Sequence, residues 1–200
     1  MTQPKTIQQM RGVDPVPPPL SKSALIIIDA QQEYQSGPLA LPGLDAAVTE
    51  TAALLDRARA LGTPILHIVH QGSPGGAFDL DAPRGAILPA LTPRAGEPVI
   101  RKTRASAFAD TDLQLRLAAL GTPPLILVGF MTHNCVAGTA HSASALGMTV
   151  TIVNSASATR ALPLPNGGAV DADTLHQATL SGLSDTIARI VPQAGDIPDH

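Results

Sequence analysis

The chain has 200 residues, enough for one α/β domain with a full core and too few for two ordinary domains. Its 13 Lys and Arg residues against 16 Asp and Glu residues give a formal net charge of −3, which offers no broad basic surface for nucleic acid. Charged residues make up 14% of the chain and hydrophobic residues 44%, a balance typical of a compact domain rather than a disordered or coiled-coil chain. We therefore expect no nucleic-acid partner.

The apolar stretches of the sequence are short, and LILVGFM at 125–131 is among the longest. A membrane helix needs ~20 apolar residues, and a secretory signal needs an apolar core that the polar N-terminus lacks. We expect no membrane partner and a cytoplasmic location. The single cysteine, Cys135, excludes an intramolecular disulfide.

The chain begins with a proline-rich segment, residues 1–20, that ends in DPVPPPL. Three consecutive prolines favour an extended polyproline conformation, so we expect an N-terminal arm outside the core. Such an arm is either a frayed terminus, a segment docked on a neighbouring subunit or a ligand for an SH3-type domain. We expect the folded domain over residues 21–193 and a C-terminal tail over 194–200.

From residue 24 the chain alternates between short apolar runs rich in β-branched residues and segments with apolar residues at helical spacing. The runs predict strands at 24–29, 64–70, 98–100, 124–130 and 148–154. The helical spacing predicts helices at 44–62, 111–121, 134–147 and 171–191. Repeated βα units predict an α/β fold, a doubly wound and mainly parallel sheet of five to six strands with helices on both faces, in a Rossmann-like three-layer sandwich.

Two connections, 71–97 and 154–170, are longer than ordinary structureless loops. Both follow the carboxyl ends of predicted strands, where open α/β sheets bind their ligands. We therefore expect these connections to form pocket walls or lids.

Three reactive side chains occupy the same edge of the predicted sheet. Asp29 ends the first strand, Lys102 follows the strand at 98–100, and Cys135 begins the helix after the strand at 124–130. Taken singly, they could be a strand-end cap, a solvated charge and a small core residue. Taken together, a helix N-terminus and a nearby ammonium group would lower the pKa of the thiol below ~8.5 and make Cys135 a nucleophile.

Aromatic residues are scarce, with one Tyr, three Phe and no Trp. Tyr34, Phe108 and Phe130 each lie five or six positions from one of the three reactive residues. This placement indicates an apolar pocket wall, although ordinary core packing would also explain it.

These residues lie in segments that resemble a known family. ALIIIDAQQEY, KTRASAF and VGFMTHNCVAGTAHSASALG resemble, in order and approximate spacing, the signature segments of the isochorismatase-like cysteine hydrolases. ATRALPLPNGGAVDADTLHQATL resembles the family's C-terminal stretch. The resemblance covers about 21–191, and the family also contains nicotinamidases, N-carbamoylsarcosine amidases, ureidoacrylate amidohydrolases and streptothricin hydrolases.

The resemblance implies a catalytic triad of Asp29, Lys102 and Cys135. In the implied mechanism Asp29 accepts the thiol proton, Lys102 orients and stabilises the charged pair, and the Cys135 thiolate attacks the substrate carbonyl. It also implies a cis peptide bond between Phe130 and Met131, with the backbone N–H groups of Met131 and Cys135 forming an oxyanion hole. The family is commonly dimeric or larger, so a homodimer or larger assembly is expected.

The sequence departs from the nicotinamidases of the family, which bind a metal through an Asp-x-His pair and a second His. The corresponding loop here is FDLDAPRG, which lacks histidine, so we expect no metal and no cofactor. His67 and His70, three apart on one strand, point to opposite faces and cannot bind one ion as a pair. His67 is expected to pack within the strand, whereas His70 could reach the pocket.

Several further residues are candidates for the substrate pocket. Gln31 matches the family's Asp-x-Gln pattern, and His133 lies two residues before the cysteine, where a solvated loop histidine is the alternative. Arg104 and Arg160 could neutralise an anionic substrate or could simply be solvated. His141 and His176 fall in predicted helices, on the surface or in the core.

The pattern as a whole predicts a cysteine hydrolase without a cofactor that cleaves a carbon–nitrogen bond of a small amide or carbamoyl compound. The first alternative is isochorismatase activity, which cleaves a vinyl ether, and the second is a binding module that has lost catalysis. The sequence contains neither a phosphate-binding loop nor the Gly-x-Ser-x-Gly motif of serine hydrolases.

Overall fold

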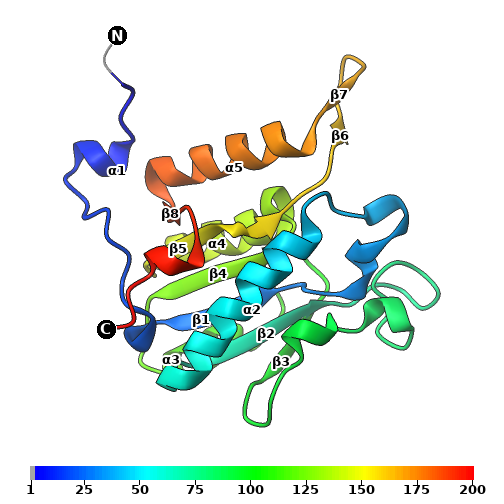
Figure 1. Ribbon diagram of the computed structural model, residues 1–200, viewed down its shortest axis with the longest axis horizontal. Coiled ribbons are helices and arrows are strands. Elements are labelled where there is room, and N and C mark those ends of the chain that lie inside the picture. Colours follow the sequence, from blue (N-terminus) through cyan, green and yellow to red (C-terminus); the bar gives the residue numbers. More distant parts are fainter. Residues whose placement is uncertain (1–2) are drawn as a thin grey trace.

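The structure is a computed structural model that describes residues 3–200. Its centre is a six-stranded sheet in the order β3-β2-β1-β4-β5-β8, and each neighbouring pair of strands is parallel. The strands are β1 (Ala24–Ile28), β2 (Ile65–His70), β3 (Val99–Lys102), β4 (Leu125–Phe130), β5 (Val150–Ala158) and β8 (Arg189–Val191). The predicted α/β fold with a mainly parallel sheet is confirmed (Figure 1).

Helices cover both faces of this sheet, as predicted. The longer ones are α2 (Leu44–Leu61), α3 (Leu113–Ala119), α4 (Ala137–Ala145) and α5 (Ala172–Thr186). The buried side of α2 belongs to one hydrophobic cluster, and the buried sides of α3, α4 and α5 belong to a second. β1 supplies both clusters in alternation, with Leu25 and Ile27 in the first and Ile26 and Ile28 in the second. A strand buried on both faces explains why its sequence is a continuous apolar run.

The last predicted helix ends earlier than its sequence pattern indicated. α5 ends at Thr186, and Arg189–Val191 forms the edge strand β8 beside β5. The apolar residues at 187–191 extend the helical pattern of α5, but Ile190 and Val191 are β-branched and pair with Ile152 and Val153. The prediction of helix to residue 191 was therefore wrong over its last turn.

The expected loop at 154–170 is also partly ordered as strand. β5 continues to Ala158, and β6 (Leu162–Pro163) and β7 (Ala169–Val170) form a short antiparallel hairpin. This hairpin projects from the body of the molecule (Figure 1). The run NSASA at the end of β5 consists of small and polar residues, which carry no strand pattern.

The N-terminal segment is not wholly extended within the described residues, and Met1 and Thr2 lie outside them. Its α1 (Ile7–Met10) is one helical turn that begins at the capping box of Thr6 and Gln9. The Ile7 N–H donates to Asp185 at the end of α5 at 2.7 Å. The C-terminal residues also contact the domain, because the N–H of the buried Leu20 donates to the carbonyl of Pro198 at 2.8 Å. Both termini therefore hydrogen-bond to this chain's own domain.

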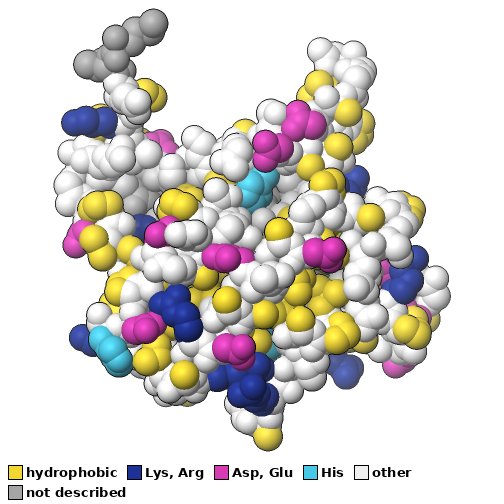
Figure 2. Space-filling model, viewed as in Figure 1, with side chains coloured by type: hydrophobic (Ala, Val, Ile, Leu, Met, Phe, Trp, Pro, Cys, Tyr) yellow, Lys and Arg dark blue, Asp and Glu magenta, His cyan; other side chains and the backbone are white. Residues whose placement is uncertain are grey.

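The surface carries mixed charge. On the face drawn in Figure 2, acidic and basic side chains are interspersed among polar and apolar ones. Among residues 3–200, no helix is long and apolar enough to cross a membrane.

Candidate active site

The structure brings Asp29, Lys102 and Cys135 together at the carboxyl edge of the sheet. Asp29 follows β1, Lys102 is the last residue of β3, and Cys135 lies in a π-helical turn, Thr132–Val136, that follows β4 and is called the Cys135 turn below. The Lys102 Nζ lies 2.7 Å from Asp29 Oδ2 and 3.2 Å from Cys135 Sγ. The three side chains are buried, at 0%, 2% and 4% exposed for Asp29, Lys102 and Cys135.

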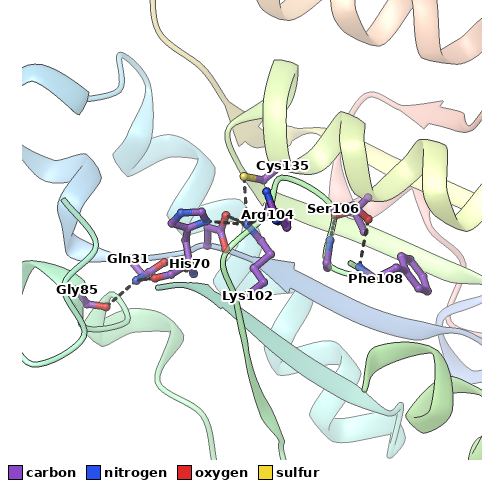
Figure 3. Close-up of polar contacts among 11 residues, drawn as sticks. Gln31, His70, Gly85, Lys102, Arg104, Ser106, Phe108 and Cys135 are labelled. Carbon is purple, nitrogen blue, oxygen red and sulfur yellow. Dashed lines mark hydrogen bonds and ion pairs between the residues drawn. The ribbon is translucent and has the colours of Figure 1, made fainter. Parts of the chain in front are cut away.

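Four acceptors surround the Lys102 ammonium group (Figure 3). Besides Asp29 and Cys135, Nζ lies 3.1 Å from the carbonyl oxygen of Arg104 and 3.2 Å from His70 Nδ1. His70 is the neighbour of Lys102 across β2 and β3, which explains their contact. An ammonium group has three N–H donors, so these four acceptors share them. Contacts with four acceptors thus fix the position of the Lys102 ammonium group.

The charge state of Cys135 differs from the sequence expectation. Burial raises the pKa of the thiol to about 12, the Asp29 carboxylate adds to this rise, and Lys102 opposes it only in part. The predicted lowering of the thiol pKa was therefore wrong, because it counted the ammonium and the helix end but not burial or the neighbouring carboxylate. At neutral pH the thiol keeps its proton and needs a base.

Asp29 has an oxygen free to act as that base. Its Oδ2 accepts from Lys102, whereas Oδ1 is buried and has no hydrogen-bond partner among residues 3–200. Burial raises the pKa of Asp29, and the ammonium of Lys102 opposes that rise. A buried carboxylate whose pKa is raised has a greater affinity for a proton, as a general base requires.

The backbone around Cys135 has an unusual path. The peptide bond between Phe130 and Met131 is cis, and the N–H groups of Asn134 and Val136 both donate to the carbonyl of Met131. Upstream, Gly129 has φ +112°, and a Cβ there would lie 2.1 Å from the carbonyl oxygen of Ile28. Only glycine fits this approach of β4 to β1, one residue before the cis peptide bond.

Three aromatic rings pack together beside His70, and one of them, Phe78, was missed by the sequence reasoning. Tyr34 packs edge-to-face on Phe130 at 5.6 Å and on Phe78 at 5.2 Å, measured between ring centroids. Phe78 also packs on the His70 ring at 5.2 Å. Phe78 lies in the long connection 71–97 that was expected to wall the pocket, and it is the one aromatic residue there. Its place in this connection is the sequence feature that could have identified Phe78 as a site residue.

Phe108 lies elsewhere. It packs against the cluster on the face of α3 and α4, and in Figure 3 its ring points away from Lys102 and Cys135. Its backbone N–H donates to Ser106 Oγ at 3.2 Å. Its nearness to Lys102 in sequence therefore does not bring its ring into the group of Tyr34 and Phe130.

The Gln31 side chain hydrogen-bonds to backbone groups on two segments beside the site. Its Nε2 donates to the carbonyl oxygens of His70 and Gly85, at 3.0 and 2.8 Å, and its Oε1 accepts from the His70 N–H at 2.8 Å. These three bonds tie the connection 71–97 to the end of β2. Gln31 thus supports His70 and is fully engaged by backbone groups.

The remaining candidates lie at different depths. His133 is half-buried and hydrogen-bonded to Thr159, and both burial and the charge of Arg160 lower its pKa. The guanidinium of Arg104 is 70% exposed and paired with Asp110, so only its carbonyl takes part in the site. His67 is buried in β2 and bonded to Glu97 at 3.1 Å, as expected of a packed strand histidine.

One group of donor atoms could in principle hold a metal ion. The ligand atoms of Asp29, His70 and Cys135 all lie within 4.8 Å of one another. The ammonium of Lys102 lies within 3.2 Å of each of them and already supplies a positive charge there. The absence of a metal requirement stays a prediction.

The family follows from comparison with known proteins. A model of the isochorismatase domain matches residues 23–192. The chain belongs to the isochorismatase family. It is 35% identical over 188 residues to the secreted isochorismatase effector Isc1 of Verticillium dahliae, covering 93% of this chain and 96% of that protein. It is also 35% identical over 149 residues to maleamate amidohydrolase of Pseudomonas putida, covering 66% of this chain and 70% of that protein.

Solved structures agree. The crystal structure of an isochorismatase from Pseudomonas putida KT2440 matches with a TM-score of 0.91 and 44% identity, covering 96% of this chain and 99% of that one. The predicted family and the predicted hydrolase class are confirmed. Because Isc1 is named a secreted protein, the cytoplasmic location stays a prediction, as does self-association.

Proposed function

We propose that this member of the isochorismatase family hydrolyses a carbon–nitrogen bond of a small amide or carbamoyl compound through a thioester on Cys135. The observation that carries the proposal is the buried contact of one ammonium group with a carboxylate at 2.7 Å and a thiol at 3.2 Å. This arrangement pairs a nucleophile with a base and a fixed positive charge. A binding module without catalysis would not need a buried nucleophile beside a base.

The first chemical step begins with a protonated thiol. As the substrate carbonyl approaches, Asp29 Oδ1 takes the proton from Cys135 Sγ, and the sulfur attacks the carbonyl carbon. The ammonium of Lys102 stabilises the forming thiolate and keeps Asp29 oriented through Oδ2. The N–H groups of Met131 and Cys135 stabilise the oxyanion of the tetrahedral intermediate.

The second half of the reaction returns the proton. Asp29 gives it to the leaving nitrogen, the C–N bond breaks, and the acyl or carbamoyl group remains on the sulfur as a thioester or thiocarbamate. Asp29 then removes a proton from water, which attacks the same carbon and releases the acid and the thiol. Each proton that Asp29 accepts is given up again, so the cycle balances.

We place His70 and the aromatic rings beside it opposite Cys135 in the substrate pocket. Because His70 Nδ1 faces the Lys102 ammonium, it must be unprotonated there, and burial and Lys102 both lower its pKa. The neutral ring then carries its proton on Nε2 and offers it to a polar atom of the substrate. The partly buried Phe78, backed by the buried Tyr34 and Phe130, gives the pocket an apolar wall.

The charge of Arg160 favours an anionic substrate. Its Nε is buried and has no partner among residues 3–200, and its charge is close enough to lower the pKa of His133. A substrate carboxylate would satisfy this guanidinium. Maleamate, the substrate in the name of one relative, has both a carboxylate and an amide group.

Isochorismatase activity is the second candidate, because the matching domain model and one of the similar solved structures carry that name. Vinyl-ether hydrolysis needs no thioester, so an intact Cys135 with its own base favours amide hydrolysis. A panel of amide and carbamoyl acids assayed for ammonia, beside isochorismate assayed for pyruvate, separates the two.

The decisive variant is Cys135→Ala. We expect ammonia release from the best amide to fall roughly a thousandfold or more, because the nucleophile acts as a unit with its base. Ser144→Ala, which removes one side-chain heteroatom from α4, is the matched control and should keep full activity. Full amide hydrolysis by Cys135→Ala, or turnover of isochorismate alone, would contradict the proposal.

A further inference from the structure

His176 on α5 joins two segments that lie far from it in sequence. Its Nδ1 lies 2.8 Å from the hydroxyl oxygen of Thr132, the first residue of the Cys135 turn. Its Nε2 lies 2.6 Å from Oδ1 of Asn154 in β5. The bond to Thr132 is buried, so water does not compete freely for it, whereas the bond to Asn154 is partly buried. The imidazole thus bridges a helix, a strand and the turn that carries the cysteine.

The protons of this bridge have one consistent arrangement. The amide oxygen of Asn154 can only accept, so Nε2 of His176 carries a proton and donates it. A neutral ring then leaves Nδ1 as an acceptor for the Thr132 hydroxyl. Burial lowers the pKa of His176, although Asp173 nearby opposes this, and so favours the neutral ring. Both ring nitrogens are therefore used.

A purely structural explanation accounts poorly for this residue. α5 turns Leu180 and Leu183 toward the core, four and seven residues after His176 and on the same helix face. An apolar residue at 176 would continue that face without removing two ring nitrogens from water. A histidine at this position is therefore best explained by the two hydrogen bonds that its ring makes.

The bonded partner is the turn at the centre of the proposed reaction. Thr132 directly follows Met131, whose N–H is a proposed oxyanion donor, and precedes Cys135 by three residues. The Cys135 turn has no side-chain cap of its own at its N-terminus. The bond from Thr132 to His176 therefore restrains the turn from outside.

We propose that His176 is a positioning residue that fixes Thr132 and, through it, the Met131 N–H and the Cys135 sulfur against the reacting carbonyl. This inference rests on the proposed function for its catalytic readout but concerns a residue that touches no substrate. Losing the support of a catalytic group from behind commonly lowers activity about tenfold to a hundredfold. The effect should fall on kcat, because the substrate contacts are unchanged.

The test removes the bridge from both ends. We expect His176→Leu to lower kcat about tenfold to a hundredfold with KM changed less than about threefold. Thr132→Val should give a similar loss, and the double variant should be no worse than the poorer single variant, since both variants lack the same bond between Thr132 and His176. His176→Gln, which keeps a donor and an acceptor, should recover part of the loss.

The control is His141→Leu on the exposed face of α4, which should leave kcat unchanged. A second readout needs no substrate and so separates this inference from the proposed function. The rate of Cys135 alkylation by iodoacetamide should change at least about threefold in His176→Leu, because the sulfur is less confined. If His176→Leu lowers only the melting temperature, with alkylation rate and kcat unchanged, the residue is structural and the inference is overturned. Additive losses in the double variant would also overturn it.

Discussion

Cys135 is flanked by two opposite charges, and their effects on the thiol can be separated by substitution. The Asp29 carboxylate raises the pKa of the thiol, whereas the Lys102 ammonium lowers it. We expect Asp29→Asn to speed iodoacetamide alkylation of Cys135 near neutral pH and Lys102→Met to slow it, both relative to the wild type. A fall of one in the thiol pKa gives about ten times more thiolate, so the changes are measurable as rates against pH.

Hydrolysis should respond differently from alkylation. Both variants should lose amide hydrolysis, because one lacks the base and the other the charge that stabilises the thiolate. If Cys135 is alkylated faster in Asp29→Asn while amide hydrolysis is slower, Asp29 is needed for proton transfer and not to make the sulfur accessible. Alkylation rates that shift in the same direction in both variants would contradict this electrostatic account.

Single residues also show where sequence reasoning stops. Asp29, Lys102 and Cys135 were predicted to meet because each follows a strand at the same edge of a parallel sheet, and they do lie together. The protonation of Cys135 was not predictable, since it depends on burial and on which neighbour lies closer. The contact of Phe78 with Tyr34 was not predictable either, because it forms only through the fold of a long connection.

At the scale of elements, the Gln31 side chain is one of several ties on the connection 71–97, beside the backbone pairing of 30–32 with 86–88. This side chain makes three bonds to backbone groups of His70 and Gly85. At about 1 kcal/mol for each such bond, Gln31→Leu should lower the free energy of unfolding by about 3 kcal/mol. The connection should also become more mobile, since it loses its tie to β2.

Limited proteolysis and urea unfolding check this prediction. We expect faster cleavage within 71–97 in Gln31→Leu and a lower kcat, because His70 and Phe78 lose their support. Gln35→Leu is the matched control, since Gln35 is exposed and lies four residues after Gln31. Equal cleavage rates in the two variants would show that the connection is held by other contacts, such as the ion pair of Glu33 with Arg84 at 2.6 Å.

Elements were predictable where composition and burial agree. The central strands are apolar on both faces, so their sequences are continuous runs that admit few other interpretations. β8 was missed because an apolar segment directly after a helix continues the helical pattern, and only its pairing with β5 makes it a strand. The order of the strands depends on contacts between residues far apart in the chain, which a local pattern does not contain.

At the scale of the whole molecule, buried histidines make stability depend on pH. Burial lowers the pKa of His67, His70, His133 and His176 below the ordinary value of 6.5. Above that pH the folded and unfolded chains are both neutral at these positions. Below it the unfolded chain binds protons that the folded chain does not, so the free energy of unfolding should fall as the pH drops from about 7.5 to about 5.5.

Urea unfolding at several pH values measures this slope, and a single variant tests its cause. His67→Gln removes one buried histidine, so its free energy of unfolding should fall less steeply below pH 6.5, whatever stability it loses at pH 7.5. His141→Gln changes an exposed histidine of α4 and should retain the wild-type slope. Because Glu97 bonds to Arg59 and His67 and has a pKa of about 2, its contribution is lost only at still lower pH and does not interfere. A slope in His67→Gln equal to that of the wild type would mean that His67 takes up its proton without opening the fold.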